Sequence, residues 1–311
     1  MKIVVLGALG HIGSSLIREI PLLIDTSEII LVDNFRTQRY CSLFDLDQQQ
    51  SYQFYNRDIA SDDIEDITKN CDIIINLAAI TDAAQSFENA DEVESVNFQC
   101  LENAVNAATK NNAKLIHLSS TSVYGTQISE VDENCKIDDL KPQSPYAKSK
   151  ISEENFLQHT SDLKFTILRF GTIFGVTPGI RFHTAVNKFC IQACMNEPLT
   201  VWTTALDQKR PYLDIGDATR SIVFAIKKNM FDGEIFNVVT CNFTVNDILD
   251  EIRTFIPDVE INLVDHEIMN QLSYEVSSKK IMERGFEFNG SISAEIEKTI
   301  SLFKGIKNNL Q

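Results

Sequence analysis

Over its first 170 residues the chain alternates between short apolar runs and amphipathic segments, and this alternation constrains the fold more than any other feature. The apolar runs lie at 2–7, 28–33, 71–79, 114–120 and 164–170. They are almost continuously apolar, which is typical of parallel strands that are covered on both faces. The intervening segments at 11–20, 91–110 and 144–160 have the apolar spacing of helices. We therefore expect an α/β fold built on a doubly wound parallel sheet.

The pattern loosens after Phe170, where helical spacing near 184–196, 217–228, 244–256 and 293–304 surrounds shorter apolar runs at 199–202 and 260–264. This region is predicted to form a smaller C-terminal α/β substrate-binding domain. The run at 233–239 has the character of a further strand of the main sheet. The expected division is a domain of residues 1–170, with a returning segment near 210–240, and a second domain of residues 171–311.

The overall charge excludes several classes of function. With 28 Lys and Arg against 44 Asp and Glu, the formal net charge is −16, which argues against nucleic acids and anionic membranes as partners. A bound phosphate would need a local site that works against this field. The seven cysteines are scattered without a C-x-x-C pair, which predicts no metal site and a reducing, cytoplasmic compartment. No signal peptide or apolar run of membrane-spanning length is evident.

A glycine triplet lies between the first strand and the first helix. The stretch "GALGHIG" places Gly7, Gly10 and Gly13 there, where a tight turn and a helix N-terminus can cradle a pyrophosphate. The triplet alone would also fit a plain strand–helix turn. Asp33 ends the second strand 33 − 13 = 20 residues after Gly13, where a carboxylate accepts ribose hydroxyls. Together these features predict a Rossmann-type domain that binds a dinucleotide.

The nature of residue 33 indicates which dinucleotide is bound. A carboxylate at Asp33 would repel a 2′-phosphate, which favours NAD over NADP. Arg36 and Arg39 follow closely and keep NADP open as the alternative.

The stretch "SPYAKSK" (144–150) carries a tyrosine and two lysines. In a helix Lys150 lies one turn after Tyr146 on the same face, whereas Lys148 points away. Tyr146 and Lys150 can form a proton-transfer pair or be two neighbours on a wet surface. Lys148 is expected to be a solvated charge, and His117, within a strand, a core residue.

In the order and separation of its motifs, the chain resembles the extended short-chain dehydrogenase/reductase family, which contains NAD-dependent nucleotide-sugar epimerases and dehydratases. The motifs that carry the resemblance are the glycine triplet, "RDI" (57–59), "NLAA" (76–79), "SSTSVYG" (119–125), "YAKSK" (146–150), "LRFGTIFG" (168–175) and "RPYLDIGD" (210–217). They cover nearly the whole chain.

The resemblance implies three groups of site residues. The catalytic residues would be Ser120, Tyr146 and Lys150. The NAD site would comprise Gly7, Gly10, His11, Ile12, Gly13, Asp33, Asn34, Asp58, Ile59, Leu77, Ala78, Ala79, Asn97, Tyr146, Lys150 and Phe170. Toward the substrate, Arg210 would match the family's diphosphate-binding arginine and Thr172 lies at a substrate-binding position. Arg181, near the expected cleft, is a further candidate for a phosphate, although both arginines could instead be surface charges.

These residue types suit the oxidation of a sugar hydroxyl, in which a proton and a hydride must leave together. A free tyrosine, with a pKa of about 10, is a poor base at neutral pH. The ammonium of Lys150 and an oxidised nicotinamide would both favour the phenolate of Tyr146. Ser120, at the C-terminal end of a strand, would hold the same substrate oxygen.

Four positions depart from the family pattern. Related dehydratases carry an Asp–Glu pair directly after the active-site Ser or Thr, where this chain has Thr121 and Ser122. Neither can act as a strong acid, so 4,6-dehydration is disfavoured. Thr172 replaces a frequent substrate-binding asparagine, and Asp214 replaces a frequent histidine.

The sequence therefore predicts an NAD-dependent nucleotide-sugar 4-epimerase that acts through a transient 4-keto sugar. The alternatives are a C4 dehydrogenase or ketoreductase that uses the same residues, and a catalytically silent NAD-binding regulator. The resemblance also implies a homodimer formed through helices near 92–110 and 146–160.

Overall fold

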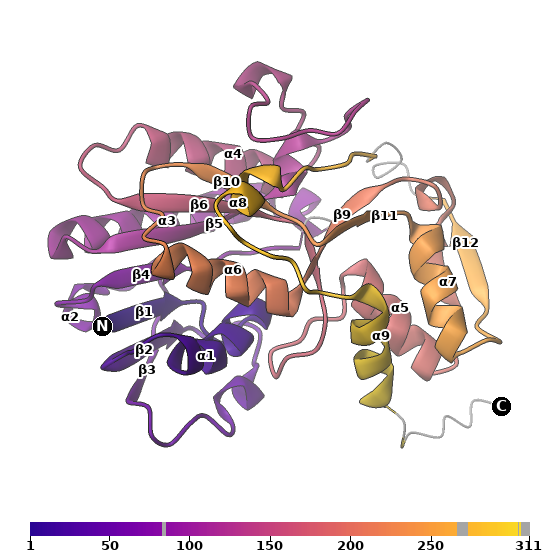
Figure 1. Cartoon of the computed structure of the whole chain (residues 1–311), viewed down its shortest axis with the longest axis horizontal. Coiled ribbons are helices and arrows are strands. Elements are labelled where there is room, and N and C mark those ends of the chain that lie inside the picture. Colours follow the sequence, from indigo (N-terminus) through magenta and orange to yellow (C-terminus); the bar gives the residue numbers. More distant parts are fainter. Residues whose placement is uncertain (83–84, 266–272, 304, 306–311) are drawn as a thin grey trace.

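The computed structural model describes residues 1–82, 85–265, 273–303 and 305. The larger part of the fold is built around a sheet of seven parallel strands (Figure 1). The strands are β1 (Lys2–Leu6), β2 (Glu28–Asp33), β3 (Tyr52–Asn56), β4 (Ile73–Asn76), β5 (Lys114–Ser120), β6 (Phe165–Phe170) and β10 (Ile235–Val238). Their order across the sheet is β10-β6-β5-β4-β1-β2-β3. The doubly wound parallel sheet that the sequence predicts is confirmed.

Two layers of helices cover the sheet because successive side chains of a strand point to opposite faces. On β1, Ile3 and Val5 pack with α1 (His11–Leu23) and α6 (Ile215–Lys227). Val4 and Leu6 pack on the other face with α3 (Ala90–Asn111) and α4 (Pro145–Gln158). Burial on both faces explains why the strands are continuously apolar.

The strand order reverses between β1 and β4, which lie side by side although β2 and β3 come between them in the chain. The loops that leave β1 and β4 therefore diverge to opposite faces of the sheet. Such a switch point leaves a crevice at the carboxyl ends of the strands, and ligands of this fold bind there. Gly7 follows β1 and Leu77 follows β4, so the glycine turn and the "NLAA" motif meet at this crevice.

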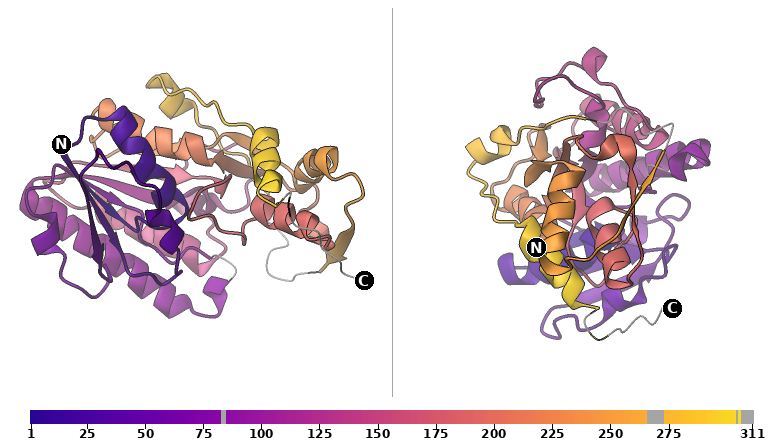
Figure 2. Two further views of the ribbon diagram at one scale, coloured as in Figure 1. Left: turned by 90° about the horizontal axis from the view of Figure 1, so that it is seen from below. Right: turned by 90° about the vertical axis from the view of Figure 1, so that its right-hand side faces the viewer.

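A smaller region lies beside the sheet (Figure 2). It has a separate core, in which Phe174, Val186, Leu199, Ile248 and Ile296 are buried together. Its helices are α5 (Ala185–Cys194), α7 (Val245–Phe255) and α9 (Ile292–Ser301). Its strands form two small sheets, β7 (Thr172–Phe174), β9 (Arg210–Asp214) and β11 (Cys241–Phe243) in one, and β8 (Leu199–Trp202) and β12 (Ile261–Val264) in the other. The short elements that complete the description are α2 (Glu65–Thr68), α8 (Lys279–Glu283) and 3₁₀ turns at Tyr40–Leu43, Gln85–Phe87, Thr121–Tyr124, Ile137–Asp139 and Thr203–Ala205.

The run at 233–239 supplies β10, which pairs in parallel with β6 at the edge of the main sheet. The chain therefore returns to the seven-stranded sheet after it has formed β7, β8 and β9 of the smaller region. The helix expected at 293–304 ends at Ser301, and residue 304 lies outside the described residues. In the part of the chain that the structure describes, no helix has the length and apolar character to cross a membrane.

Candidate active site

The start of α4 sets the relation between Tyr146 and Lys150. Ser144 is the N-cap, and its side chain accepts a hydrogen bond from the backbone N–H of Ala147 at 3.1 Å. Pro145 follows at the first helical position, where its missing N–H costs nothing. Tyr146 and Lys150 are then one helical turn apart, with Lys150 Nζ 5.7 Å from the centroid of the tyrosine ring. Lys148 is exposed, as expected, whereas Lys150 is buried.

A cavity of about 350 Å³ lies between the main sheet and the smaller region. Half-buried Tyr146 and Ser120, from α4 and the end of β5, lie on its wall together with Lys150. The other expected site residues that line it are Ile12, Leu77, Ala78, Ala79, Phe170, Thr172, Arg181 and Arg210. The fold therefore gathers the three expected catalytic residues and the three expected substrate contacts around one space.

The glycine turn fits a dinucleotide in its backbone geometry. Gly7 has φ of +77°, and a Cβ there would lie 2.8 Å from the backbone nitrogen of Ala78. A Cβ on Gly13 would lie 2.5 Å from the carbonyl oxygen of Gly7. Helix α1 begins directly after Gly10 without a side-chain cap, so the N–H groups of its first turn face the turn and can bind an anion. His11 is buried, and its Nε2 lies 2.9 Å from the carbonyl oxygen of Gly175, so the expected contact of His11 with NAD would come from its backbone.

Gly13→Ala is expected to weaken NAD binding about tenfold or more, because the new methyl group forces the turn apart at a cost of about 1–3 kcal/mol. Titration calorimetry with NAD measures the change. Gly305→Ala is the matched control, since a Cβ there meets no atom of the described residues within 4 Å. An affinity in G13A equal to that of the control would contradict the assignment of this turn to the cofactor.

The expected adenosine contacts lie along the ends of β2 and β3, outside the cavity. Asp33 accepts hydrogen bonds from the backbone N–H groups of Leu9 and Phe35 at 3.1 and 3.0 Å. Burial raises the pKa of its carboxyl group, and those two bonds oppose the rise. Asn34 donates from Nδ2 to Asp58 Oδ2 at 3.1 Å, which joins two expected contacts. The Ile59 side chain is buried in the core beneath them.

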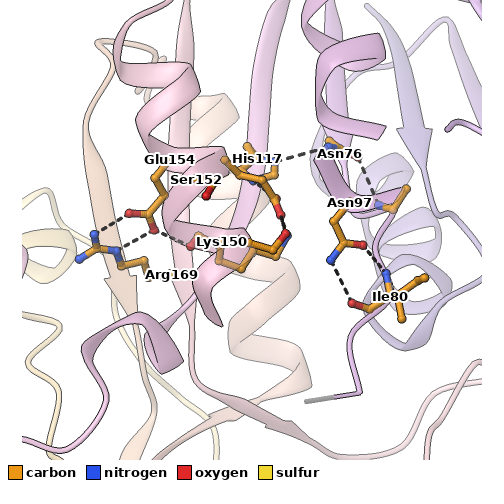
Figure 3. A network of polar contacts seen from close by, with 12 residues as sticks. Asn76, Ile80, Asn97, His117, Lys150, Ser152, Glu154 and Arg169 are labelled. Atoms are coloured by element: carbon orange, nitrogen blue, oxygen red, sulfur yellow. Dashed lines mark hydrogen bonds and ion pairs between the residues drawn. The ribbon is translucent and has the colours of Figure 1, made fainter. Parts of the chain in front are cut away.

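Both the oxygen and the nitrogen of the Asn97 side-chain amide bind the protein backbone. Its Oδ1 accepts the N–H of Ile80 at 2.7 Å, and its Nδ2 donates to the carbonyl oxygen of Ile80 at 3.1 Å (Figure 3). It is 1% exposed and does not line the cavity. In this structure it fixes the chain after β4, so its expected role toward NAD would be exerted through that segment.

The cavity is cationic although the protein is acidic. Of the described residues that line it, Lys150, Arg181, Lys188 and Arg210 are cationic and Asp82 is the one carboxylate. Arg181 donates from Nη1 to Thr81 at 2.6 Å, and Arg210 donates from Nη2 to Gln208 at 3.4 Å. The Nε atoms of both arginines are buried without a partner within the described part of the chain. These donors supply the local site that a phosphate needs in a protein of net charge −16.

Three of the four positions that depart from the family pattern line the cavity, and the fourth does not. Ser122 lines the cavity, and its buried Oγ has no hydrogen-bond partner among the described residues. Thr121 Oγ1 donates to the carbonyl oxygen of Phe170 at 3.3 Å. Thr172 also lines the cavity. Asp214 does not, since it caps α6 and accepts the N–H groups of Gly216 and Asp217 at 2.7 and 3.2 Å.

Sequence reasoning missed the buried polar groups behind the expected catalytic residues. Glu153 contacts Lys150, and Glu154 pairs with Arg169 on β6, both beneath the cavity wall. Glu153 could have been found from its spacing, because side chains three residues apart meet on a helix. The partner of Glu154 is Arg169 on another element, β6, so no local sequence pattern indicates this pair. Lys188 was also missed, since nothing in the sequence shows that α5 turns it toward the cavity.

The parallel sheet, the glycine turn at its switch point and the tyrosine–lysine pair define a dinucleotide-dependent enzyme of the Rossmann type. The chain belongs to the NAD dependent epimerase/dehydratase family, whose model matches residues 3–239.

Three relatives illustrate the range of this family. The uncharacterized UDP-glucose epimerase YtcB of Bacillus subtilis (strain 168) is 28% identical over 76% of this chain and 76% of its own length. The dTDP-D-glucose 4,6-dehydratase of Bos taurus is 27% identical over 97% of this chain and 88% of its own. The UDP-glucuronic acid 4-epimerase of Bacillus cereus, solved with UDP-glucuronic acid and NAD, superposes with a TM-score of 0.84 at 25% identity, covering 98% of this chain and 99% of that one.

Proposed function

We propose that this protein is an NAD-dependent nucleotide-sugar 4-epimerase that acts through a transient 4-keto sugar. The observation that carries the proposal is the convergence of Ser120, Tyr146 and Lys150 on one cationic cavity at the carboxyl ends of the parallel strands. Epimerases and dehydratases both occur among the relatives, so the reaction is argued from the residues of this chain.

Each residue has a defined task in this reaction. Tyr146 removes the proton of the sugar C4 hydroxyl, and Ser120 donates a hydrogen bond that holds the same oxygen in line. Lys150 supplies a positive charge that favours the phenolate. NAD, which the glycine turn and Asp33 would hold, would supply a hydride acceptor for C4 that is regenerated when the ketone is reduced from its opposite face. Tyr146 then gives its proton back, so the cycle needs no net reductant.

The unpaired arginine donors support a diphosphate-bearing substrate. Buried guanidinium N–H groups without acceptors are costly, and a diphosphate would satisfy them with strong charge-assisted hydrogen bonds. Arg210 lies in the motif that holds the diphosphate in the family, and Arg181 and Lys188 share the cavity with it.

Arg210→Met is expected to raise the KM for a nucleotide sugar by about 10- to 100-fold, the equivalent of losing a hydrogen bond to a charged group. The mutation should change kcat far less, because the contact is remote from C4. Steady-state kinetics measure both constants. Lys209→Met is the control, since Lys209 is exposed and pairs with Glu275. Equal KM values in the two variants would argue against diphosphate binding by Arg210.

Dehydration is disfavoured because Thr121 and Ser122 provide no acid at the positions that follow Ser120. Elimination of water from a sugar requires a group that protonates the leaving hydroxyl. Among the described residues of the cavity wall, Asp82 is the one carboxylate, and it lies in the segment after β4.

The direct test is incubation of the purified protein with UDP- and dTDP-linked hexoses and hexuronic acids, followed by NMR of the products. A sugar inverted at C4 without added NAD supports the epimerase. Accumulation of a 4-keto sugar together with NADH would instead indicate a C4 dehydrogenase. A 4-keto-6-deoxy product would indicate a dehydratase, and absence of turnover on all substrates would favour a regulator.

A homodimer formed through α3 and α4 is also part of the proposal. The two helices pack side by side in the monomer, and Phe98 and Phe156 form a half-buried edge-to-face pair across them with centroids 5.2 Å apart. Sedimentation equilibrium of the wild type and of Phe98→Lys measures the association. A monomeric wild type at micromolar concentration would exclude this dimer.

A further inference from the structure

Glu153 is a buried carboxylate in direct contact with the catalytic lysine. It lies three residues after Lys150 in α4 and is 1% exposed. Its Oε2 accepts a hydrogen bond from Lys150 Nζ at 2.8 Å, and its Oε1 accepts one from Ser149 Oγ at 2.8 Å. His117 Nε2 lies 3.0 Å from the same Oε2, although it is not aligned to donate a full hydrogen bond. Glu153 therefore links the lysine to a histidine on β5.

The contacts continue from His117 to the end of β4. Asn76 Oδ1 accepts the N–H of Ala78 at 3.3 Å, which turns Asn76 Nδ2 toward His117 Nδ1 at 3.4 Å (Figure 3). An amide NH₂ group only donates, so His117 Nδ1 accepts and Nε2 carries the proton that faces Glu153. A buried polar row, defined here as Asn76, His117, Glu153 and Lys150, thus runs from the cofactor side of the sheet to the catalytic helix.

Lys150 needs such a partner because it is itself 3% exposed. Burial by itself lowers the pKa of Lys150, but the Glu153 carboxylate and then Tyr146 raise the pKa above its ordinary value. Burial likewise opposes ionisation of Glu153, and Lys150 and His117 more than offset this, so its pKa is lowered. Cys100 on α3 also acts on Lys150, and burial raises the pKa of Cys100 to about 12. Glu154 on α4 acts on His117.

We propose that Glu153 is a positioning residue that keeps Lys150 in its ammonium form and fixes it beside Tyr146. An ammonium group has three N–H donors. The Glu153 contact uses one, which leaves two for the ribose hydroxyls of the cofactor and for the phenolate side. Through Asn76, the polar row also connects Lys150 to the backbone N–H of Ala78, a residue that lines the same cavity. This role deepens the proposed function and rests on it.

The neighbouring Glu154 provides a matched control within the same helix. It is also buried, at 4% exposure, but it accepts hydrogen bonds from Arg169 at 2.9 and 2.6 Å and from Ser119 at 2.5 Å. Glu154→Gln and Glu153→Gln thus remove equally buried charges from adjacent positions. Only Glu153→Gln removes the carboxylate that contacts Lys150.

The first experiment follows the charge of Lys150 and needs no substrate. The side-chain Cε resonance of Lys150 is recorded in ¹³C-lysine-labelled protein with NAD and assigned by its loss in Lys150→Arg. In E153Q this resonance should titrate at a lower pH than in the wild type. In Glu153→Asp, whose carboxylate is one methylene further away, a smaller displacement in the same direction is expected, which keeps the test valid if E153Q does not fold.

The second experiment measures kcat against pH on a substrate found in the panel above. For E153Q, kcat should fall by about tenfold or more between pH 7 and pH 9, an interval over which the wild type and E154Q stay level. A purely structural role would lower kcat equally at every pH. The proposal would be overturned if the Lys150 resonance titrated in E153Q and E153D at the same pH as in the wild type. It would also be overturned if the titration of this resonance moved by the same amount in E154Q. If no substrate is turned over, the proposed function fails, while the NMR titration still decides the role of Glu153.

Discussion

Replacing Tyr146 by phenylalanine is expected to abolish turnover, with kcat reduced by about 10³-fold or more. The substitution removes one oxygen atom, the group that takes the proton from the sugar hydroxyl. It leaves the ring that faces Lys150 Nζ at 5.7 Å, so the local packing should be retained. NAD affinity should change little, because the contacts expected to hold the dinucleotide come mainly from the glycine turn and Asp33.

Two measurements distinguish this outcome from general damage. Titration calorimetry with NAD reports whether the cofactor still binds to Tyr146→Phe, and a product assay reports turnover. Tyr55→Phe is the control, because the Tyr55 hydroxyl contacts Gln53 on the distant strand β3 and that variant should react like the wild type. A Tyr146→Phe variant with wild-type kcat would remove the mechanism proposed here.

Arg169→Leu is expected to lower the free energy of unfolding by about 3–5 kcal/mol. Arg169 is buried on β6, where its Nε and Nη2 donate to the two oxygens of Glu154 and its Nη1 donates to Tyr124 at 2.8 Å. Leucine would leave the Glu154 carboxylate inside the protein without its cation. Tyr124, which also donates to Asn237 at 2.9 Å, would lose part of the same network.

Urea denaturation followed by circular dichroism measures this loss. Arg253→Leu is the matched control, since Arg253 pairs with Asp250 on the exposed face of α7 and such surface pairs contribute less than about 1 kcal/mol. If the free energy of unfolding falls equally in the two variants, the Arg169–Glu154 pair does not stabilise the fold.

The position of the cavity follows from strand order. The switch between β1 and β4 brings the glycine turn beside the "NLAA" segment, and β5 and α4 add Ser120, Tyr146 and Lys150 from the next units along the chain. The smaller region closes the other side with Arg181, Arg210 and neighbouring residues. In the proposed function, the residues expected to act at C4 and those expected to bind the diphosphate therefore lie on opposite walls of the cavity.

Local patterns in the sequence determined much of this architecture. Continuous apolar runs predicted the parallel strands, because such strands are buried on both faces. The glycine triplet predicted the turn at the first helix, since a Cβ at Gly13 would collide with the backbone. The apolar spacing at 144–160 predicted a helix there, and within a helix Tyr146 and Lys150 lie one turn apart. Each of these inferences depends on residues close together in the chain.

Only the tertiary structure decided which polar groups support the catalytic residues. His117 meets Asn76 across 41 residues, and Arg181 meets Thr81 across 100, so neither contact has a sequence periodicity. The structure also showed that Asn97 binds the backbone of Ile80 and that Asp214 caps a helix. The physical reason is that burial sets the free-energy cost of a charge or an amide, and burial arises from packing between distant segments. A sequence can therefore name the tyrosine and the lysine and place Glu153 within one turn of that lysine, but the burial of this pair arises only when the sheet and helices are assembled.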